Sequence, residues 1–121
     1  MSYEFYKVLH VLGAFTILMS LGGIALHTAN GGTRSYGNRK WIAMIHGIGL
    51  LISLVAGFGL LARLGLMKGL PGWVLVKLIV WLALGAAPVL FYKKSALSKT
   101  LFFAVLALGL IAVFMAVYKP F

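Results

Sequence analysis

Residues 101–118 read LFFAVLALGLIAVFMAVY and contain no ionisable or hydroxyl-bearing side chain before Tyr118. An apolar run of about 17–25 residues crosses a hydrocarbon core of about 30 Å as a single α-helix. Three earlier runs are of similar length and nearly as apolar: Val8 to Leu26, Trp41 to Ala62 and Trp73 to Phe91. We therefore predict membrane-spanning helices near residues 6–27, 41–62, 73–92 and 100–118.

The whole chain has the composition of an integral membrane protein. Its 121 residues are 63% hydrophobic and 10% charged, whereas soluble domains carry about 25% charged residues. This composition excludes a water-soluble globule, a disordered chain and a disulfide-stabilised secreted domain. Because the chain has no Cys, thiol catalysis, thiolate metal sites and iron–sulfur clusters are excluded as well. Four strands cannot close a barrel and an open sheet edge is not viable in lipid, so the predicted fold is all-α.

The three links between the apolar runs are short and polar. The first contains Asn30-Gly31-Gly32, the second ends with Leu70-Pro71-Gly72, and the third, Tyr92 to Lys99, is basic. Links this short favour neighbouring helices that alternate in direction. We therefore predict one transmembrane domain, residues 1–121, folded as an up-down-up-down antiparallel four-helix bundle.

The formal net charge of +10 comes mainly from basic residues in the links and at the ends of the spans. At these positions basic residues face anionic lipid headgroups. By the positive-inside rule, the side of the membrane with more basic residues in its links is assigned to the cytoplasm. The first and third links hold six basic residues and the opposite side holds four, so both termini are predicted on the non-cytoplasmic side of a bacterial inner membrane. Nucleic-acid binding is set aside, because the basic residues are divided between two membrane faces. The six are Arg34, Arg39, Lys40, Lys93, Lys94 and Lys99, and the four are Lys7, Arg63, Lys68 and Lys119.

Two ionisable side chains inside the spans are predicted to lie at a similar depth. His10 is near the outer end of the first span, and Lys77 is four residues into the third span, which starts on the same side. Ionisable groups within spans are rare and costly, so each is a candidate for function. His46, five residues into the second span, and His27, at the end of the first, are expected toward the other side.

Lys77 has no acidic partner within the spans, because the chain has no Asp and its only acidic side chain is Glu4. A buried ammonium needs a partner or must lose its proton. Glu4 or the terminal carboxylate of Phe121 could reach Lys77, or its long stem could carry the ammonium to the interface. Otherwise the amine is neutral, exposed to water or bound to an anionic molecule from outside.

The second span also presents a face of small and polar residues. His46, Gly49, Ser53 and Gly57 follow at spacings of three and four, which places them on one side of a helix. Such a face usually allows close approach of a neighbouring helix, and it could also admit a flat ligand. His46 is interpreted equally well as a hydrogen-bonded packing residue. In the third span, Pro88 removes a backbone donor and is expected to kink the helix.

Short motifs in the first three spans resemble those of known membrane protein families. The first span contains Tyr6-Lys7-Val8-Leu9-His10, the second contains His46, and the third opens with Trp73-Val74-Leu75-Val76-Lys77-Leu78. The chain thereby resembles the small four-helix proteins of the SirB type, and also the HemJ type that is proposed to oxidise protoporphyrinogen. The resemblance implies that His10 and Lys77 are a functional pair with haem b as cofactor. It aligns His46 with a histidine of the SirB-like pattern.

Three kinds of function are consistent with these residues. In the first, the protein binds haem or another tetrapyrrole for membrane redox chemistry, with His10 and Lys77 as candidate iron ligands and His46 as a second ligand or proton relay. In the second, it is a non-catalytic membrane module that packs against or assembles a larger complex, with a homo-oligomer as one form. In the third, a quinone or lipid binds between the same residues. Whether the protein is an enzyme stays open.

Overall fold

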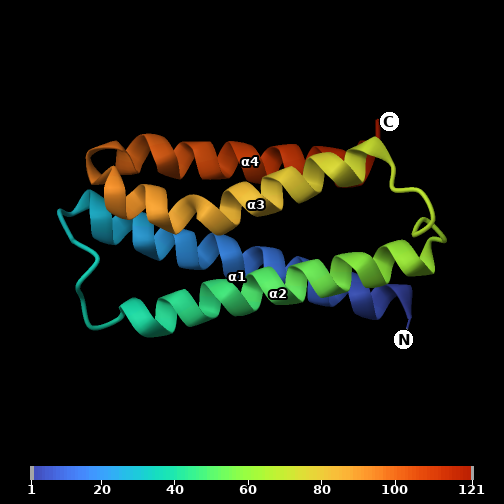
Figure 1. Ribbon diagram of the computed structural model, residues 1–121, viewed down its shortest axis with the longest axis horizontal. Helices are drawn as coiled ribbons and strands as arrows, with labels where there is room; N and C mark the ends of the chain where they lie inside the picture. The colour runs from blue at the N-terminus through green and yellow to red at the C-terminus, as the bar shows by residue number, and fades with distance from the viewer. Residues whose placement is uncertain (1, 121) are drawn as a thin grey trace.

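A computed structural model describes residues 2–120 and consists, over that range, of helices joined by short links. The long helices run in alternating directions, so the all-α, up-down-up-down bundle predicted from the sequence is confirmed. Both chain ends and the α2–α3 link lie at one end of the bundle, and the other two links lie at the opposite end (Figure 1). The elements are α1 (Tyr3–Ala29), α2 (Arg39–Arg63), α3 (Gly72–Lys93), the short 3-10 helix η1 (Ser95–Leu97) and α4 (Ser98–Tyr118).

All four long helices are long and apolar enough to cross a membrane. They extend up to three residues beyond the predicted ranges, because polar residues at the ends continue or cap the helix. Ser2, for example, accepts a hydrogen bond at its hydroxyl from the Phe5 amide (3.2 Å) and so caps α1. The chain is a small integral membrane protein.

Two of the helices end in glycine turns that determine where the chain reverses. After α1, Gly31 adopts φ 85°, and the Gly32 amide donates to the His27 carbonyl (2.9 Å). After α2, Gly65 adopts φ 73°, and the Leu66 amide donates to the Leu61 carbonyl (2.9 Å). In both turns the hydrogen bond satisfies a carbonyl at the end of the helix. The residue with positive φ in such a turn is usually Gly, because other residues are strained in that conformation.

The closest helix pair is α1 with α2, which pack backbone against backbone. A Cβ atom added at Gly13 would lie 2.7 Å from the Ser53 amide nitrogen and 3.0 Å from the Gly49 carbonyl oxygen. Gly49 and Ser53 are themselves buried. The small-residue face of α2 is therefore covered by α1 of the same chain, as expected for close helix packing in a membrane.

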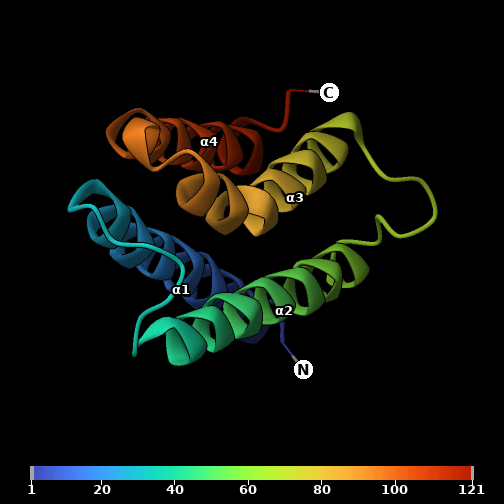
Figure 2. The ribbon, with the colours of Figure 1, turned by 60° about the vertical axis from the view of Figure 1, so that its left-hand side comes forward.

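The main core is formed where α1, α3 and α4 meet. In Figure 2, α3 and α4 lie together in the upper half of the molecule and α1 lies with α2 in the lower half. Phe91, Leu21 and Ile24 are each about fully buried there. A polar contact supports this core at the link end, where Ser98 hydrogen-bonds to the Thr28 hydroxyl (2.6 Å). The core residues are Ile17, Leu21, Ile24, Ala25, Val80, Leu84, Ala87, Phe91 and Val105.

Helix α4 lies at the outside of the bundle, and its buried residues are Ser98 and Val105. Large side chains such as Phe103 (66% exposed) and Leu110 (69% exposed) point away from the other helices. In water such a surface would be a large exposed apolar patch. In a bilayer the acyl chains cover it, which accounts for the complete absence of ionisable residues from 101 to 117.

Candidate functional site

His10 is held by α2 at the small-residue face described above. Its Nδ1 atom lies 2.8 Å from the Ser53 carbonyl oxygen. A carbonyl can only accept, so Nδ1 carries the proton and Nε2 has a free lone pair. Gly57 provides the space for the ring, since a Cβ atom there would lie 3.2 Å from the His10 Cε1 atom. The position, orientation and tautomer of His10 are thus set by α2.

Lys77 reaches His10 from α3. Its Nζ atom lies 3.5 Å from His10 Nε2, and both side chains are partly buried. The amine donates and the imidazole accepts, over a distance longer than the usual range of about 2.7–3.2 Å for hydrogen bonds from nitrogen. The two residues are 67 positions apart in sequence. The structure therefore brings together the two side chains that the sequence placed at a similar depth.

The contact partner of Lys77 is an imidazole and not a carboxylate. Among residues 2–120, no carboxylate contacts Lys77, while the ammonium of Lys119 lies nearby with its Nζ 5.3 Å from the ring centre of Trp73. The Phe121 carboxylate lies outside the described residues. Within residues 2–120, the charged group that acts on Lys77 is therefore another ammonium, that of Lys119.

His46 lies at another level of the bundle. Its Nε2 atom donates to the Leu84 carbonyl oxygen (3.1 Å). That carbonyl lacks its usual helical donor, because the residue four positions on is Pro88, which has no amide hydrogen. His46 precedes Ser53 by seven residues, or about 10 Å along the helix axis. The structure does not bring His46 to the His10–Lys77 pair, and it gives His46 a hydrogen-bonding role between α2 and α3.

A further residue that sequence reasoning did not single out connects two helices. The Trp81 indole nitrogen of α3 donates to the Leu50 carbonyl of α2 (3.0 Å), so α2 and α3 are joined by side chains at two levels. Within residues 2–120, no buried side-chain nitrogen or oxygen lacks a hydrogen-bond partner. The sequence does not indicate the hydrogen bond of Trp81 to Leu50, because Trp81 lies in an apolar run and its sequence neighbours are aliphatic.

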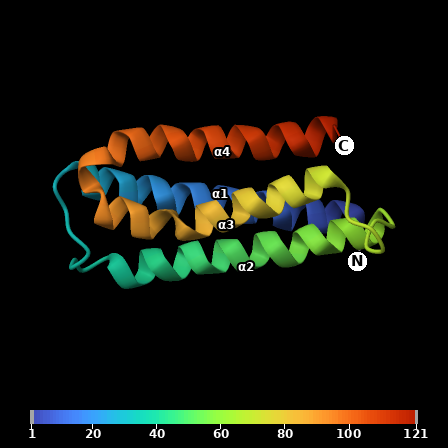
Figure 3. The same ribbon diagram turned by 45° about the horizontal axis from the view of Figure 1, so that its top comes forward.

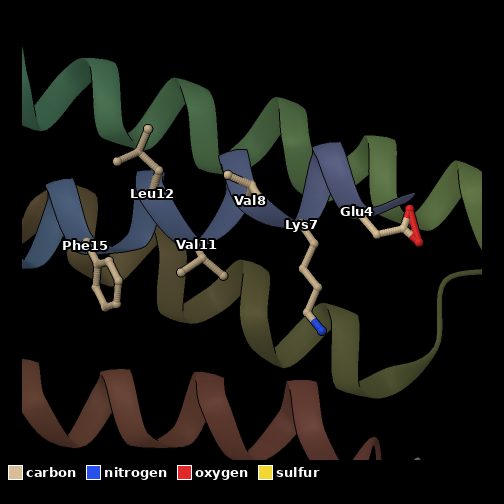
Figure 4. A pocket seen from close by; sticks show the side chains of 6 residues that line it. All are labelled: Glu4, Lys7, Val8, Val11, Leu12 and Phe15. Carbon is tan, nitrogen blue, oxygen red and sulfur yellow. The ribbon is translucent and has the colours of Figure 1, made fainter. Parts of the chain in front are cut away.

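A shallow hollow of about 480 Å³ lies on the outer face of α1 and does not include the pair. Figure 4 shows that its labelled side chains all come from this one helix. Because the lining is exposed, and apolar apart from Glu4 and Lys7 near the start of the helix, we assign the hollow to the lipid-facing surface. Its lining residues are Glu4, Lys7, Val8, Val11, Leu12 and Phe15.

Comparisons with known protein families, with curated proteins and with solved structures find no match for this chain. The class of protein therefore follows from the chain itself. It is a small four-helix membrane protein with a histidine and a lysine in contact between α1 and α3, beside a carbonyl of α2.

Proposed function

We propose that the His10–Lys77 pair binds an electron-carrying ligand within the membrane, with haem b or a related tetrapyrrole as the first candidate. The supporting observation is the orientation of His10. Histidines that ligate metals almost always donate their second ring N–H to a carbonyl or carboxylate, which fixes the tautomer and the ring. His10 has this arrangement, with Nδ1 on the Ser53 carbonyl and Nε2 directed at Lys77.

Lys77 adds a second group that suits the same ligand. As a neutral amine it is a nitrogen donor, and as an ammonium it binds a carboxylate such as a propionate. A cation between membrane helices is costly, and the contacts of Lys77 in the described part of the chain include no carboxylate. An anionic or metal-containing ligand would offset that cost.

The chain's own residues would hold and orient such a group. Ser53 fixes His10 through its carbonyl, and Gly57 leaves room for the ring. Haem, when bound, supplies one-electron chemistry between two iron oxidation states. In this proposal His46 takes no part in ligation, because it lies seven residues, or about 10 Å along α2, from Ser53, the residue that holds His10.

The test is an absorption spectrum of the full chain, produced with haem supply and purified in mild detergent, before and after dithionite. We expect a Soret band that shifts on reduction and that His10→Ala abolishes. His27→Ala is the matched control, because His27 lies at the other end of α1. Lys77→Ala should weaken the band, whereas Lys93→Ala, an exposed lysine of the same helix, should leave it unchanged. A colourless protein that takes up no added haem refutes the haem proposal.

A quinone is the second candidate, and the length of the Lys77–His10 contact favours it. At 3.5 Å this hydrogen bond is weak, so the amine keeps donors for a carbonyl oxygen of a quinone or lipid. Mass spectrometry of organic extracts from the purified protein separates this candidate from haem. A quinone in the wild-type extract that is lost from Lys77→Ala supports it, and an extract with membrane lipid in the same proportions in both proteins counts against it.

A non-catalytic assembly module remains the proposal of a different class. Its support is the outer surface of α4, where only Ser98 and Val105 are buried. The small residues of α2 cannot serve that purpose, because α1 of the same chain covers them. Substitutions on α4, such as Phe103→Ser, would then change the size of the particle in detergent, while His10→Ala would not.

A further inference from the structure

The end of the bundle away from the chain termini carries a concentration of positive charge. The α1–α2 link and the α3–α4 junction lie together there, as Figure 3 shows. The only acidic side chain of the protein, Glu4, is near the N-terminus at the opposite end. No Asp or Glu is therefore available to neutralise this end. Its basic residues are Arg34, Arg39, Lys40, Lys93, Lys94 and Lys99.

Within this end, two tyrosines attach the α1–α2 link to α3. The hydroxyl groups of Tyr36 and Tyr92 form a hydrogen bond, and the ring of His27 stacks on Tyr36 with the ring centres 3.7 Å apart. His27 also donates from Nε2 to the Thr33 carbonyl (2.7 Å). Gly32 permits this arrangement, because a Cβ atom there would collide with the His27 ring. These side-chain contacts therefore hold the α1–α2 link against α1 and α3.

Two arginines flank Tyr36 in the sequence, Arg34 two residues before it and Arg39 three residues after it. The guanidinium carbon of Arg34 lies 5.8 Å from the ring centre of Tyr92, within the range of a cation–π contact. Arg39 begins α2, and its amide donates to the Tyr36 carbonyl (3.3 Å). Both arginines also act electrostatically on the Tyr92 hydroxyl. Because both side chains are exposed, their donors are accessible at the level where the spans end.

We propose that Arg34 and Arg39 bind the phosphate of an anionic phospholipid headgroup at this end of the bundle. Guanidinium groups are suited to phosphate, because they offer several donors in a fixed plane. The source is the bilayer itself, since tyrosines at helix ends lie at the headgroup level. The site is independent of the His10–Lys77 pair, which contacts α2 at Ser53, fourteen residues or about 21 Å along the helix from Arg39.

The experiment uses the full chain in zwitterionic detergent and titrates it with phosphatidylglycerol or phosphatidylcholine, followed by native mass spectrometry. Each basic side chain near an anionic surface contributes about fivefold to affinity, so Arg34→Gln with Arg39→Gln should weaken phosphatidylglycerol binding about twenty-five-fold. The matched control is Lys7→Gln with Lys68→Gln, which removes the same charge from the opposite end and should change binding little. Phosphatidylcholine should bind more weakly than phosphatidylglycerol to the wild type.

Two further measurements test the proposal, one with a charge-retaining variant and one with inorganic phosphate as a competitor. Arg34→Lys with Arg39→Lys retains the charge and removes the planar donors, and we expect it to bind less tightly than the wild type. Full affinity in that variant, or an equal loss in the control pair, would show diffuse charge attraction and overturn the proposal. Excess inorganic phosphate should leave the bound lipid in place, and displacement by phosphate would overturn the assignment to a lipid.

Discussion

The hydrogen bond from His46 to the Leu84 carbonyl makes a specific prediction about folding stability. Pro88 leaves this carbonyl without a helical donor, and His46 supplies the replacement at 3.1 Å. His46→Leu keeps a side chain of similar bulk and removes the donor. Since Leu84 is buried, neither water nor headgroups can take over the bond, and the carbonyl is left unsatisfied.

The cost of that loss can be bounded. An unsatisfied buried group costs about 1–3 kcal/mol, while hydrogen bonds between membrane helices average about 0.6 kcal/mol, with values up to about 1.7. We expect His46→Leu to lower the free energy of unfolding by about 1–2 kcal/mol. In a Pro88→Ala background the new amide donates to Leu84 along the helix, so the same substitution should cost less than about 0.5 kcal/mol.

The measurement is a double-mutant cycle on unfolding in mixed micelles with increasing dodecyl sulfate, followed by circular dichroism. Trp81→Phe is the control, because it removes the other bond between α2 and α3, the one to Leu50. The Leu50 carbonyl keeps its own helical donor, the Leu54 amide, so Trp81→Phe should cost the same whether Pro88 is present or replaced by alanine. An equal cost of His46→Leu in both backgrounds would show that His46 does not replace the missing donor, and the reasoning would fail.

Two other predictions follow from the helix contacts and the links. In the same unfolding assay, Gly13→Ala should destabilise the protein by about 1–3 kcal/mol, because the added Cβ would meet backbone atoms of α2. Gly22→Ala, on the same helix, is the control, because its Cβ would meet nothing within 4 Å. It should be neutral or stabilise the protein by up to about 1 kcal/mol. The orientation inferred from the basic residues predicts that a cysteine introduced at Ser2 is labelled by an impermeant maleimide in intact cells, and that one at Ser35 is labelled only after lysis. The chain has no native Cys to interfere, and the reverse pattern would invert the orientation.

Much of the fold was predictable because a membrane leaves few choices. The run at 101–118 can only be a helix in lipid, where every backbone group must be bonded within its own segment. The sequence predicted only that His10 and Lys77 lie at a similar depth, because alternating helix directions make the first and third spans start on the same side of the membrane. Depth does not fix which way a side chain points around the helix, and only the structure shows that Lys77 turns toward His10.

The remaining features depend on the rotation of each helix, which the sequence does not determine here. In a soluble helix the apolar stripe identifies the buried face, but in these spans the lipid-facing and core-facing sides are equally apolar. Gly13 is therefore indistinguishable in the sequence from Gly22, although a Cβ atom added at Gly13 would meet α2 and one added at Gly22 would meet nothing within 4 Å. The carbonyl freed by Pro88 can be located by counting back four residues, but its donor cannot, because His46 lies on another helix.

Three hydrogen bonds that join α2 to its neighbours use backbone carbonyls as acceptors, in a chain with one acidic side chain. His10, His46 and Trp81 each donate to a backbone carbonyl of the neighbouring helix. In lipid a helical carbonyl has a second lone pair, and it is an acceptor that needs no carboxylate. Lys77 departs from this pattern, because it directs its amine at the lone pair of an imidazole that is already fixed by another bond. The Ser98–Thr28 contact also joins two side chains, but it is buried and 2.6 Å long. The Lys77–His10 contact is partly buried and 3.5 Å long, so the amine keeps donors for another molecule, and we propose the ligand site there.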